Sequence, residues 1–249
     1  MSITARLSTL CDAALALVYP QACAACGSAG VEARADAPAC AGCWRATRVF
    51  TGGETLCLKC GAPAAGGAAA AEAGAVRCRR CEAEAFTAAR ACGLYEGALR
   101  AAVLRLKTEP RVGARLAGLL DEARRRAPLD AATVVVPVPL HPERERGRGF
   151  NQAALLARAL ARRAGLPLDE WSLARVEHAE RHRAGMDRRA RRETVEGAFR
   201  VVRPRLVAGR SVLLVDDVFT TGATASACAA ALKAAGAAEV FVLTVARAR

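Results

Sequence analysis

The sequence predicts an α/β protein in which a parallel sheet with helices on both faces follows a small cysteine-rich region. Two observations support this prediction. From about residue 91 to residue 249, short apolar runs alternate with segments of helical periodicity, an order typical of parallel strands joined by crossover helices. Before them, eight of the 11 cysteines fall into four Cys-x-x-Cys pairs. We therefore expect an N-terminal helix at 1–20, a four-cysteine region at 21–90 and an α/β domain at 91–249.

Each element of the α/β domain is predicted from its own pattern. Apolar residues at helical spacing, such as Leu99, Val103 and Leu106, indicate helices, whereas short runs such as SVLLV indicate buried strands. Proline and glycine mark where the helices end. In chain order we expect helices at Leu94–Leu106 and Val112–Arg126, a strand at Thr133–Leu140, a helix at Asn151–Arg163, an edge strand at Ala198–Val202, a strand at Ser211–Val215, a helix at Thr224–Ala235 and a strand at Glu239–Val245.

The N-terminal segment does not have the length of a membrane span. Its longest apolar stretch, Leu7–Tyr19, contains Asp12 and is shorter than the roughly 20 residues that cross a bilayer. This stretch favours an amphipathic helix over an export signal. We expect no membrane insertion and a cytoplasmic location.

The paired cysteines predict metal binding. Two thiolates three residues apart can face one ion, and two such pairs complete a tetrahedron. The four pairs form an internal repeat of two units, and a glycine follows the first pair of each unit (Gly27 and Gly61). This favours two sequential metal sites, although the second and third pairs are also close enough in the sequence to share one ion. Zinc is the expected ion, in a structural role, and iron fits the same ligands. The two sites would be Cys23, Cys26, Cys40 and Cys43, and Cys57, Cys60, Cys78 and Cys81. The single cysteines Cys11, Cys92 and Cys228 are expected in the core.

A second motif, VLLVDDVFTTGAT, occupies Val212–Thr224. We expect a buried strand to end in Asp216 and Asp217, at the sheet edge where parallel sheets bind ligands. The turn that follows would direct backbone N–H groups and the positive end of a helix at an anion. The two carboxylates would accept hydrogen bonds from a pair of neighbouring hydroxyls. A phosphate beside a diol is the chemistry of a ribose 5-phosphate.

This run resembles the phosphoribosyl-pyrophosphate motif of type I phosphoribosyltransferases at all thirteen positions. The cysteine pairs, YEGALRAAVLRLK at Tyr95–Lys107, VPVPLHPERERGRGFNQAALLARAL at Val136–Leu160 and RRARRETVEGAF before the last strands resemble the ComF family. The resemblance extends from about Gln21 to residue 249. It implies a double zinc ribbon followed by a phosphoribosyltransferase-like domain. It also implies a role in natural competence, the uptake of transforming DNA, and for part of the family a helicase-like ATPase as partner.

The resemblance also implies roles for individual residues. Asp216 and Asp217 would hold the ribose diol, and Arg148 would neutralise the pyrophosphate, so that these three are the candidate catalytic residues. The ligand would be phosphoribosyl pyrophosphate with Mg²⁺. Its other binding residues would be Thr220, Thr221, Gly222, Ala223 and Thr224 at the 5-phosphate and Arg144 and Arg146 at the pyrophosphate. Asn151, Gln152 and Lys107 match the family without an assigned role.

Two functions remain open at this stage. In the first, the pocket binds phosphoribosyl pyrophosphate and transfers its phosphoribosyl group. The acceptor is open because His182 and Thr194 stand where the family usually has glutamine and asparagine. In the second, the protein is a non-catalytic adaptor that binds single-stranded DNA. The net charge of +13 and the arginine-rich stretch Arg181–Arg192 favour it, although a solvated arginine-rich surface explains the charge equally well. Trp44, Trp171, Phe150 and Phe199 are the plausible stacking residues.

Overall fold

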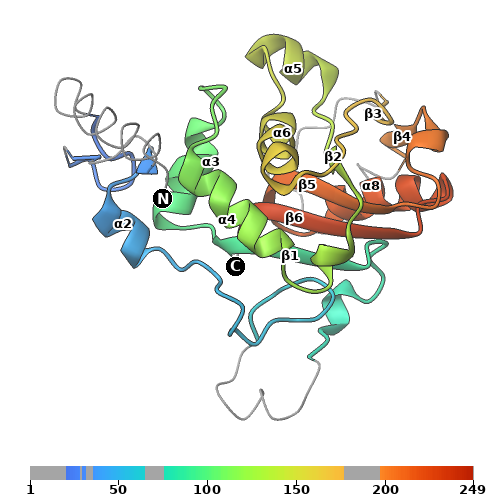
Figure 1. The fold of residues 1–249 in the computed structure, drawn as a ribbon, viewed down its shortest axis with the longest axis horizontal. Helices are drawn as coiled ribbons and strands as arrows, with labels where there is room; N and C mark the ends of the chain where they lie inside the picture. The colour runs from blue at the N-terminus through green and yellow to red at the C-terminus, as the bar shows by residue number, and fades with distance from the viewer. Residues whose placement is uncertain (1–20, 29, 32–35, 65–75, 177–196, 249) are drawn as a thin grey trace.

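The computed structural model describes residues 21–28, 30–31, 36–64, 76–176 and 197–248 (Figure 1). Its centre is a four-stranded sheet in the order β1-β6-β5-β2, and all three neighbouring pairs are parallel. This arrangement confirms the predicted parallel α/β fold. The strands are β1 (Ala88–Leu94), β2 (Val134–Pro137), β5 (Ser211–Phe219) and β6 (Glu239–Arg247).

Helices cover both faces of this sheet (Figure 1). On one face lie α3 (Gly97–Arg105), α4 (Ala114–Arg124) and α6 (Gln152–Ala164), and on the other lies α8 (Ala223–Ala234). The alternation of side chains along β5 explains the two layers. Leu213 and Val215 pack in the core under α6, whereas Val212 and Leu214 pack in the core under α8.

Smaller elements connect these layers. A short helix, α5 (Pro142–Arg148), joins β2 to α6, and β3 (Leu173–Arg175) pairs antiparallel with β4 (Phe199–Val201). The cysteine-rich region contains α2 (Ala41–Ala46), and single 3-10 turns lie at η3 (Arg79–Cys81), η4 (Leu129–Ala131) and η5 (Pro204–Leu206).

Three predicted elements differ in the structure. The strand expected at Ser211–Val215 continues to Phe219, because β6 runs beside it and pairs Phe219 with Arg247. The acid pair therefore lies inside the strand and not after it. Residues 142–148, where no helix was predicted, form α5, since Pro142 stands in its first turn and Gly149 ends it with a left-handed conformation (φ +83°).

The strand β1 is absent from the sequence prediction, which begins a helix at Leu94. Leu94 is instead the last residue of β1, and α3 begins at Gly97. Alanine-rich AARACGL lacks the β-branched residues that indicate a strand. The strand also spans the expected boundary between residues 90 and 91, and the domain division itself stays a prediction.

The cysteine-rich region packs along β1 and on both faces of the sheet. Cys23 and Trp44 belong to the core under α3, α4 and α6, whereas Cys57, Cys60 and Cys81 belong to the core under α8. Between the two units the chain runs beside β1, with a bridge from Val49 to Gly93. The edge of the sheet is thus covered, which removes a surface for unwanted strand pairing.

Some predictions fall on residues that the structure leaves undescribed: the N-terminal helix at 1–20 with Cys11, the arginine-rich stretch at 181–192, and His182 and Thr194. Among the described residues, no helix combines the length and apolarity that crossing a membrane requires.

Candidate functional site

The eight paired cysteines form two clusters. Cys23, Cys26, Cys40 and Cys43 make the first cluster, and Cys57, Cys60, Cys78 and Cys81 make the second. Within each cluster the four sulfur atoms lie within 4.8 Å of one another. The sequential pairing of the knuckles is therefore confirmed. The unpaired Cys92 and Cys228 are buried in the core, as predicted.

Backbone amides point at the sulfur atoms of both clusters. In the first cluster the Cys40 amide donates to Cys23 Sγ at 3.2 Å, and in the second the Cys78 amide donates to Cys57 Sγ at 3.3 Å. Burial raises the pKa of the Cys23 thiol, but backbone amides outweigh it and bring the pKa down to about 6. The pKa of Cys57 falls to about 6 for the same reasons. Each cluster thus favours at least one thiolate.

Another thiol in each cluster resists ionisation. Hydrogen bonds between the protonated Cys43 thiol and neighbouring sulfurs, first that of Cys40, raise the pKa of Cys43 to about 12. Burial, followed by the hydrogen bond with Cys78, raises the pKa of Cys81 well above its ordinary value. A divalent cation bound by the four sulfurs would favour the thiolate form of each of them.

The donor set fits a tetrahedral metal ion. Sulfurs around zinc, at about 2.3 Å from it, lie about 3.8 Å from one another. In the second cluster, the Sγ atoms of Cys57 and Cys81 are 3.6 Å apart, and those of Cys60 and Cys78 are 3.5 Å apart. Four thiol ligands leave no position for a substrate, so that the chemistry is that of a structural site.

The acid pair lies near the carboxyl end of β5. Burial, and then the neighbouring Asp217 charge, raises the pKa of Asp216 well above its ordinary value of 3.8. The Asp216 carboxylate accepts a local hydrogen bond at 2.8 Å from the Asp217 amide. A carboxylate in this environment gains from a hydroxyl donor or a cation.

A hydrogen-bond chain joins the acid pair to the arginine of α5. The Arg148 guanidinium donates to Gln152 Oε1, and Gln152 Nε2 donates to Asp217 Oδ2 at 3.3 Å. Gln152 is buried at the first turn of α6. The structure therefore brings together Arg148 and Asp217, which lie 69 positions apart in the sequence. Sequence reasoning found Gln152 as a family match but missed this bridging contact.

Asn151 also acquires a structural role. Its Oδ1 caps α6 by accepting from the Ala153 amide at 3.0 Å, and its Nδ2 donates to the Val138 carbonyl at 3.0 Å. The cap fixes the start of α6, and with it Gln152. An asparagine directly before an alanine- and leucine-rich helix is the sequence signal for such a cap.

The predicted phosphate loop follows β5 directly. Gly222 has φ +86° and begins α8 as its N-cap, and Thr221 Oγ1 accepts from the Ala223 amide at 3.3 Å. Thr220 is exposed, whereas Gly222 and Ala223 are buried. A Cβ on Gly222 would lie 2.8 Å from the Phe219 ring, so that glycine is required by the close packing as well as by φ.

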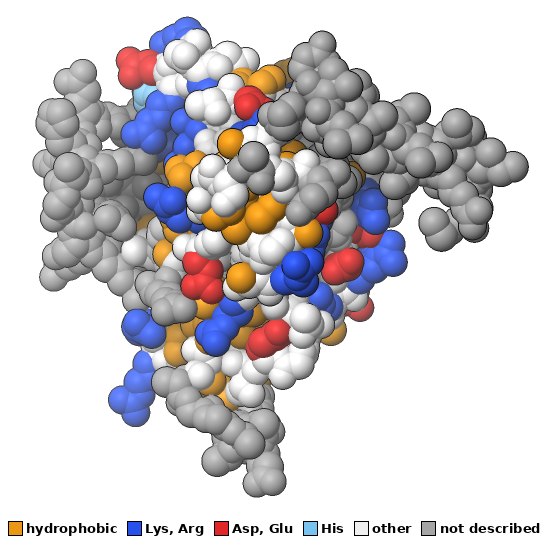
Figure 2. All heavy atoms as spheres, turned by 90° about the vertical axis from the view of Figure 1, so that its left-hand side faces the viewer, with side chains coloured by type: hydrophobic (Ala, Val, Ile, Leu, Met, Phe, Trp, Pro, Cys, Tyr) orange, Lys and Arg blue, Asp and Glu red, His pale blue; other side chains and the backbone are white. Residues whose placement is uncertain are grey.

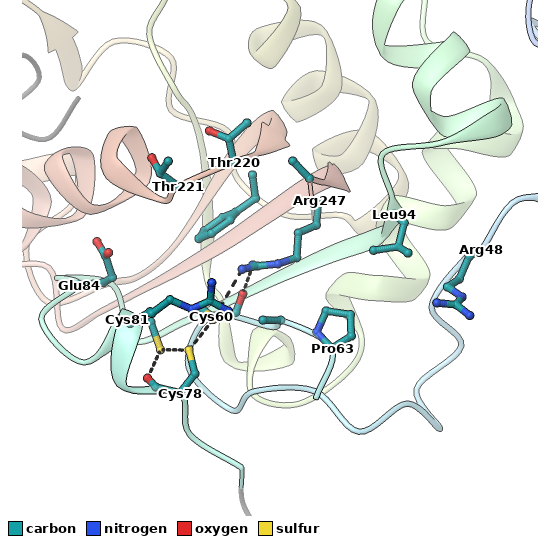
Figure 3. Close-up of a pocket in the computed structure, with 14 residues that line it drawn as sticks. Arg48, Cys60, Pro63, Cys78, Cys81, Glu84, Leu94, Thr220, Thr221 and Arg247 are labelled. Atoms are coloured by element: carbon teal, nitrogen blue, oxygen red, sulfur yellow. Dashed lines mark hydrogen bonds between the residues drawn. The ribbon is translucent and has the colours of Figure 1, made fainter. Parts of the chain in front are cut away.

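A cavity of about 430 Å³ lies between this loop and the second cluster (Figure 3). Thr220 and Thr221 form one wall, and Cys60, Cys78 and Cys81 form the opposite one. Arg48, Arg80 and Arg247 add positive charge, and Glu84 adds one acid. The sequence did not predict that the cysteine region borders the loop, because the contact depends on how the two units fold together.

The other predicted residues lie farther from this centre. Arg144 and Arg146 are exposed on α5, and the structure shows no hydrogen bond from either to the acid pair within the described residues. Lys107 is exposed just after α3. His141 caps α5 by accepting from the Glu143 amide at 3.3 Å.

Two family models match the chain. Residues 14–93 match the model of the double zinc ribbon domain, and residues 150–249 match that of the phosphoribosyl transferase domain. The first includes both cysteine clusters, and the second includes α6, the acid pair and the loop after β5.

Curated relatives match more of the chain. The DNA utilization protein YhgH of Salmonella typhimurium is 35% identical over 216 residues, which cover 84% of this chain and 89% of that protein. Competence protein F of Haemophilus influenzae is 36% identical over 128 residues, 51% of this chain and 56% of that protein. The chain thus spans most of the first relative and about half of the second.

Solved structures give more distant matches. The glutamine phosphoribosylpyrophosphate amidotransferase of B. subtilis is 21% identical with a TM-score of 0.38, and the match covers 56% of this chain and 30% of that one.

Proposed function

We propose that this chain, which belongs to the ComF family, binds phosphoribosyl pyrophosphate at the carboxyl edge of its parallel sheet. The observation that carries the proposal is the hydrogen-bond chain from Arg148 through Gln152 to Asp217. Through this chain the Arg148 cation, which would bind a pyrophosphate, is linked to the Asp217 carboxylate, which would bind a ribose diol. The intact motif from Val212 to Thr224 supports the proposal further.

In this proposal each group has one task. The backbone N–H groups from Thr220 to Thr224 and the N-terminus of α8 hold the 5-phosphate. Asp216 and Asp217 accept hydrogen bonds from the ribose hydroxyls, which relieves the repulsion between the two carboxylates. Arg148 neutralises the pyrophosphate, and Mg²⁺ bound with the pyrophosphate would supply further positive charge there.

Transfer of the phosphoribosyl group would need little more than this arrangement. Pyrophosphate leaves from a sugar carbon that gains positive charge, so that catalysis consists of positioning and of charge neutralisation at the leaving group. In this proposal Arg148 stabilises that negative charge. The acceptor is left open in this proposal.

Calorimetric titration of the zinc-loaded protein with phosphoribosyl pyrophosphate and Mg²⁺ tests binding. We expect one site per chain, with loss of binding in Asp216→Asn/Asp217→Asn. Asp130→Asn, a change at an exposed aspartate of η4, is the matched control and should bind as the unaltered protein does. Equal binding by the double variant, or none by the folded unaltered protein, would reject the proposal.

A separate assay addresses transfer. Release of pyrophosphate is measured over a panel of bases and amines, with hydrolysis in their absence as the baseline. Release that depends on one acceptor identifies an enzyme. The absence of turnover with every acceptor would reject the transferase activity and leave the binding proposal standing.

A second candidate function, a single-stranded DNA adaptor, is favoured by one exposed aromatic residue. Trp171 is 67% exposed, and the Arg203 guanidinium lies 6.0 Å from its ring centre. An exposed ring beside arginines suits base stacking and phosphate contacts. On the face at the first ribbon, by contrast, basic side chains are scattered among acidic and apolar ones (Figure 2).

Intrinsic fluorescence tests this candidate directly. The chain has two tryptophans, and Trp44 is only 2% exposed, so that quenching by an oligo-dT strand would report on Trp171. We expect quenching that weakens with salt and affinity that falls in Trp171→Ala. Binding unchanged in that variant would reject Trp171 as the stacking residue, and the absence of binding at low salt would reject the adaptor function.

The setting of both functions also belongs to this proposal. We place the protein in the cytoplasm, where reducing conditions keep thiolates available for metal, and in competence together with a helicase-like ATPase. A deletion strain with unchanged transformation frequency would contradict this role.

A further inference from the structure

One arginine connects the second cysteine cluster to the end of the sheet. Arg247, the last residue of β6, donates from Nη1 to the Cys60 carbonyl at 2.5 Å, and its Nη2 lies 3.8 Å from Cys60 Sγ. Figure 3 shows its side chain reaching from the sheet towards Cys60. A guanidinium at this position is held both by a knuckle carbonyl and by the negative charge of the sulfurs.

The same guanidinium lies over the ring that supports the phosphate loop. Arg247 is 4.6 Å from the centre of the Phe219 ring. Phe219 is the residue before Thr220, and its ring fills the space in which a Cβ of Gly222 would lie 2.8 Å away. Phe86 also packs edge-on against this ring, with the two ring centres 5.9 Å apart. A shift of the ring must therefore be passed to the loop.

We infer that Arg247 is a positioning residue through which metal binding at the second cluster sets the conformation of the phosphate loop. Four thiolates around a divalent ion carry a net charge of −2, which holds the guanidinium at the knuckle. When the ion leaves, the sulfurs take up protons, which reduces that charge, and the knuckle that presents the Cys60 carbonyl loosens. Arg247 then loses its anchor, and Phe219 loses the cation on its face.

Within the described residues the first cluster shows no such contact with β6 or the loop, so that it serves as an internal control. It contacts the opposite side of the molecule: Thr47 donates to the Cys43 carbonyl at 2.7 Å and accepts from the Ala98 amide of α3 at 2.8 Å. Among the described residues, the cysteines that line the cavity with Thr220 and Thr221 all belong to the second cluster. The inference therefore predicts that the two metal ions affect the loop unequally.

Amide hydrogen exchange of peptides that span residues 219–224 tests the inference without any ligand. Arg247→Met keeps the length of the side chain and removes the guanidinium. With two zinc ions still bound per chain, we expect exchange in the loop to be at least about tenfold faster, the size expected when a charged hydrogen bond is lost. Arg48→Met, at another wall of the same cavity, should leave the loop unchanged. Equal exchange in the two variants would overturn the inference.

A pair of cysteine variants tests the part played by the metal. Cys78→Ser and Cys26→Ser each disable one cluster, and metal analysis shows whether the other ion stays bound. We expect faster exchange at 219–224 in Cys78→Ser alone. If Cys78→Ser fails to fold, partial removal of zinc from the unaltered protein by a chelator gives the same comparison, with peptides of each cluster reporting which ion has left. Loop exchange that follows the first cluster, or neither cluster, would contradict the coupling.

The consequence for ligand binding rests on the proposed function. If the loop holds a phosphate, Arg247→Met should weaken binding of phosphoribosyl pyrophosphate by about tenfold, in step with the exchange. Faster exchange in a protein that binds no phosphoribosyl pyrophosphate would uphold the coupling and reject the proposed ligand. Faster exchange with unaltered affinity would show that the coupling does not reach the phosphate.

Discussion

Replacement of Gly222 by alanine tests how tightly the loop at residues 220–224 packs against the sheet. Two costs can be worked out from the structure. At φ +86° a residue with a Cβ pays about 1–2 kcal/mol for the left-handed conformation. The new Cβ would also lie 2.8 Å from the Phe219 ring, and relief of such an overlap in a packed core costs about 1–3 kcal/mol. We expect a total loss of about 2–5 kcal/mol in the free energy of unfolding.

Gly165→Ala separates the two costs. Gly165 ends α6 with φ +68°, and a Cβ there would meet no atom within 4 Å, so that only the backbone cost of about 1–2 kcal/mol applies. The assay is urea denaturation of the zinc-loaded proteins. The double variant Gly222→Ala/Phe219→Leu should recover part of the difference, because the shorter side chain removes the overlapping ring atoms. Equal losses in the two glycine variants would refute the argument from close packing.

Three further predictions concern the acid pair, its bridge and the metal. Folding raises the pKa of Asp216, so that the contribution of this carboxyl to stability is full below its ordinary pKa of 3.8 and is lost as pH rises through its pKa in the folded protein. Asp216→Asn should therefore raise the melting temperature at pH 7 more than at pH 4. An equal or negative change in melting temperature at pH 7 would contradict this. Gln152→Leu should weaken binding of phosphoribosyl pyrophosphate about tenfold in calorimetry with zinc content unchanged, since Arg148 loses its link to Asp217; Gln21→Leu is the control, and unaltered affinity would refute the bridge. Removal of zinc by a chelator should shift the emission of Trp44 to longer wavelength, because this buried ring packs beside the first cluster, and an unshifted spectrum would show that the ribbon keeps its packing without metal.

The comparison of prediction with structure separates local from non-local information. The strand at Ser211 and the helix after Gly222 were predictable because their apolar patterns and turn residues lie within a few positions. The strand β1 was missed because its alanines carry no β propensity. It becomes a strand by pairing with β6, whose partner residues begin about 150 positions later.

The candidate site shows the same division. The sequence by itself predicted the metal chemistry, because four Cys-x-x-Cys pairs indicate a thiolate-bound ion and the structure gathers them into two clusters. The phosphorylated sugar indicated by the acid pair and the threonine- and glycine-rich turn stays a prediction. Such motifs are short, because the groups that form each of them lie within a few residues of one another in the sequence.

Only the tertiary structure decided which groups meet. Gln152 joins Arg148 to Asp217 because α6 packs on β5, and Arg247 joins Phe219 to Cys60 because the second ribbon packs at the end of β6. Neither contact leaves a periodic pattern or a fixed spacing in the sequence. Each arises when burial of apolar surface brings distant segments together, and that energy depends on the area covered and not on the order of residues.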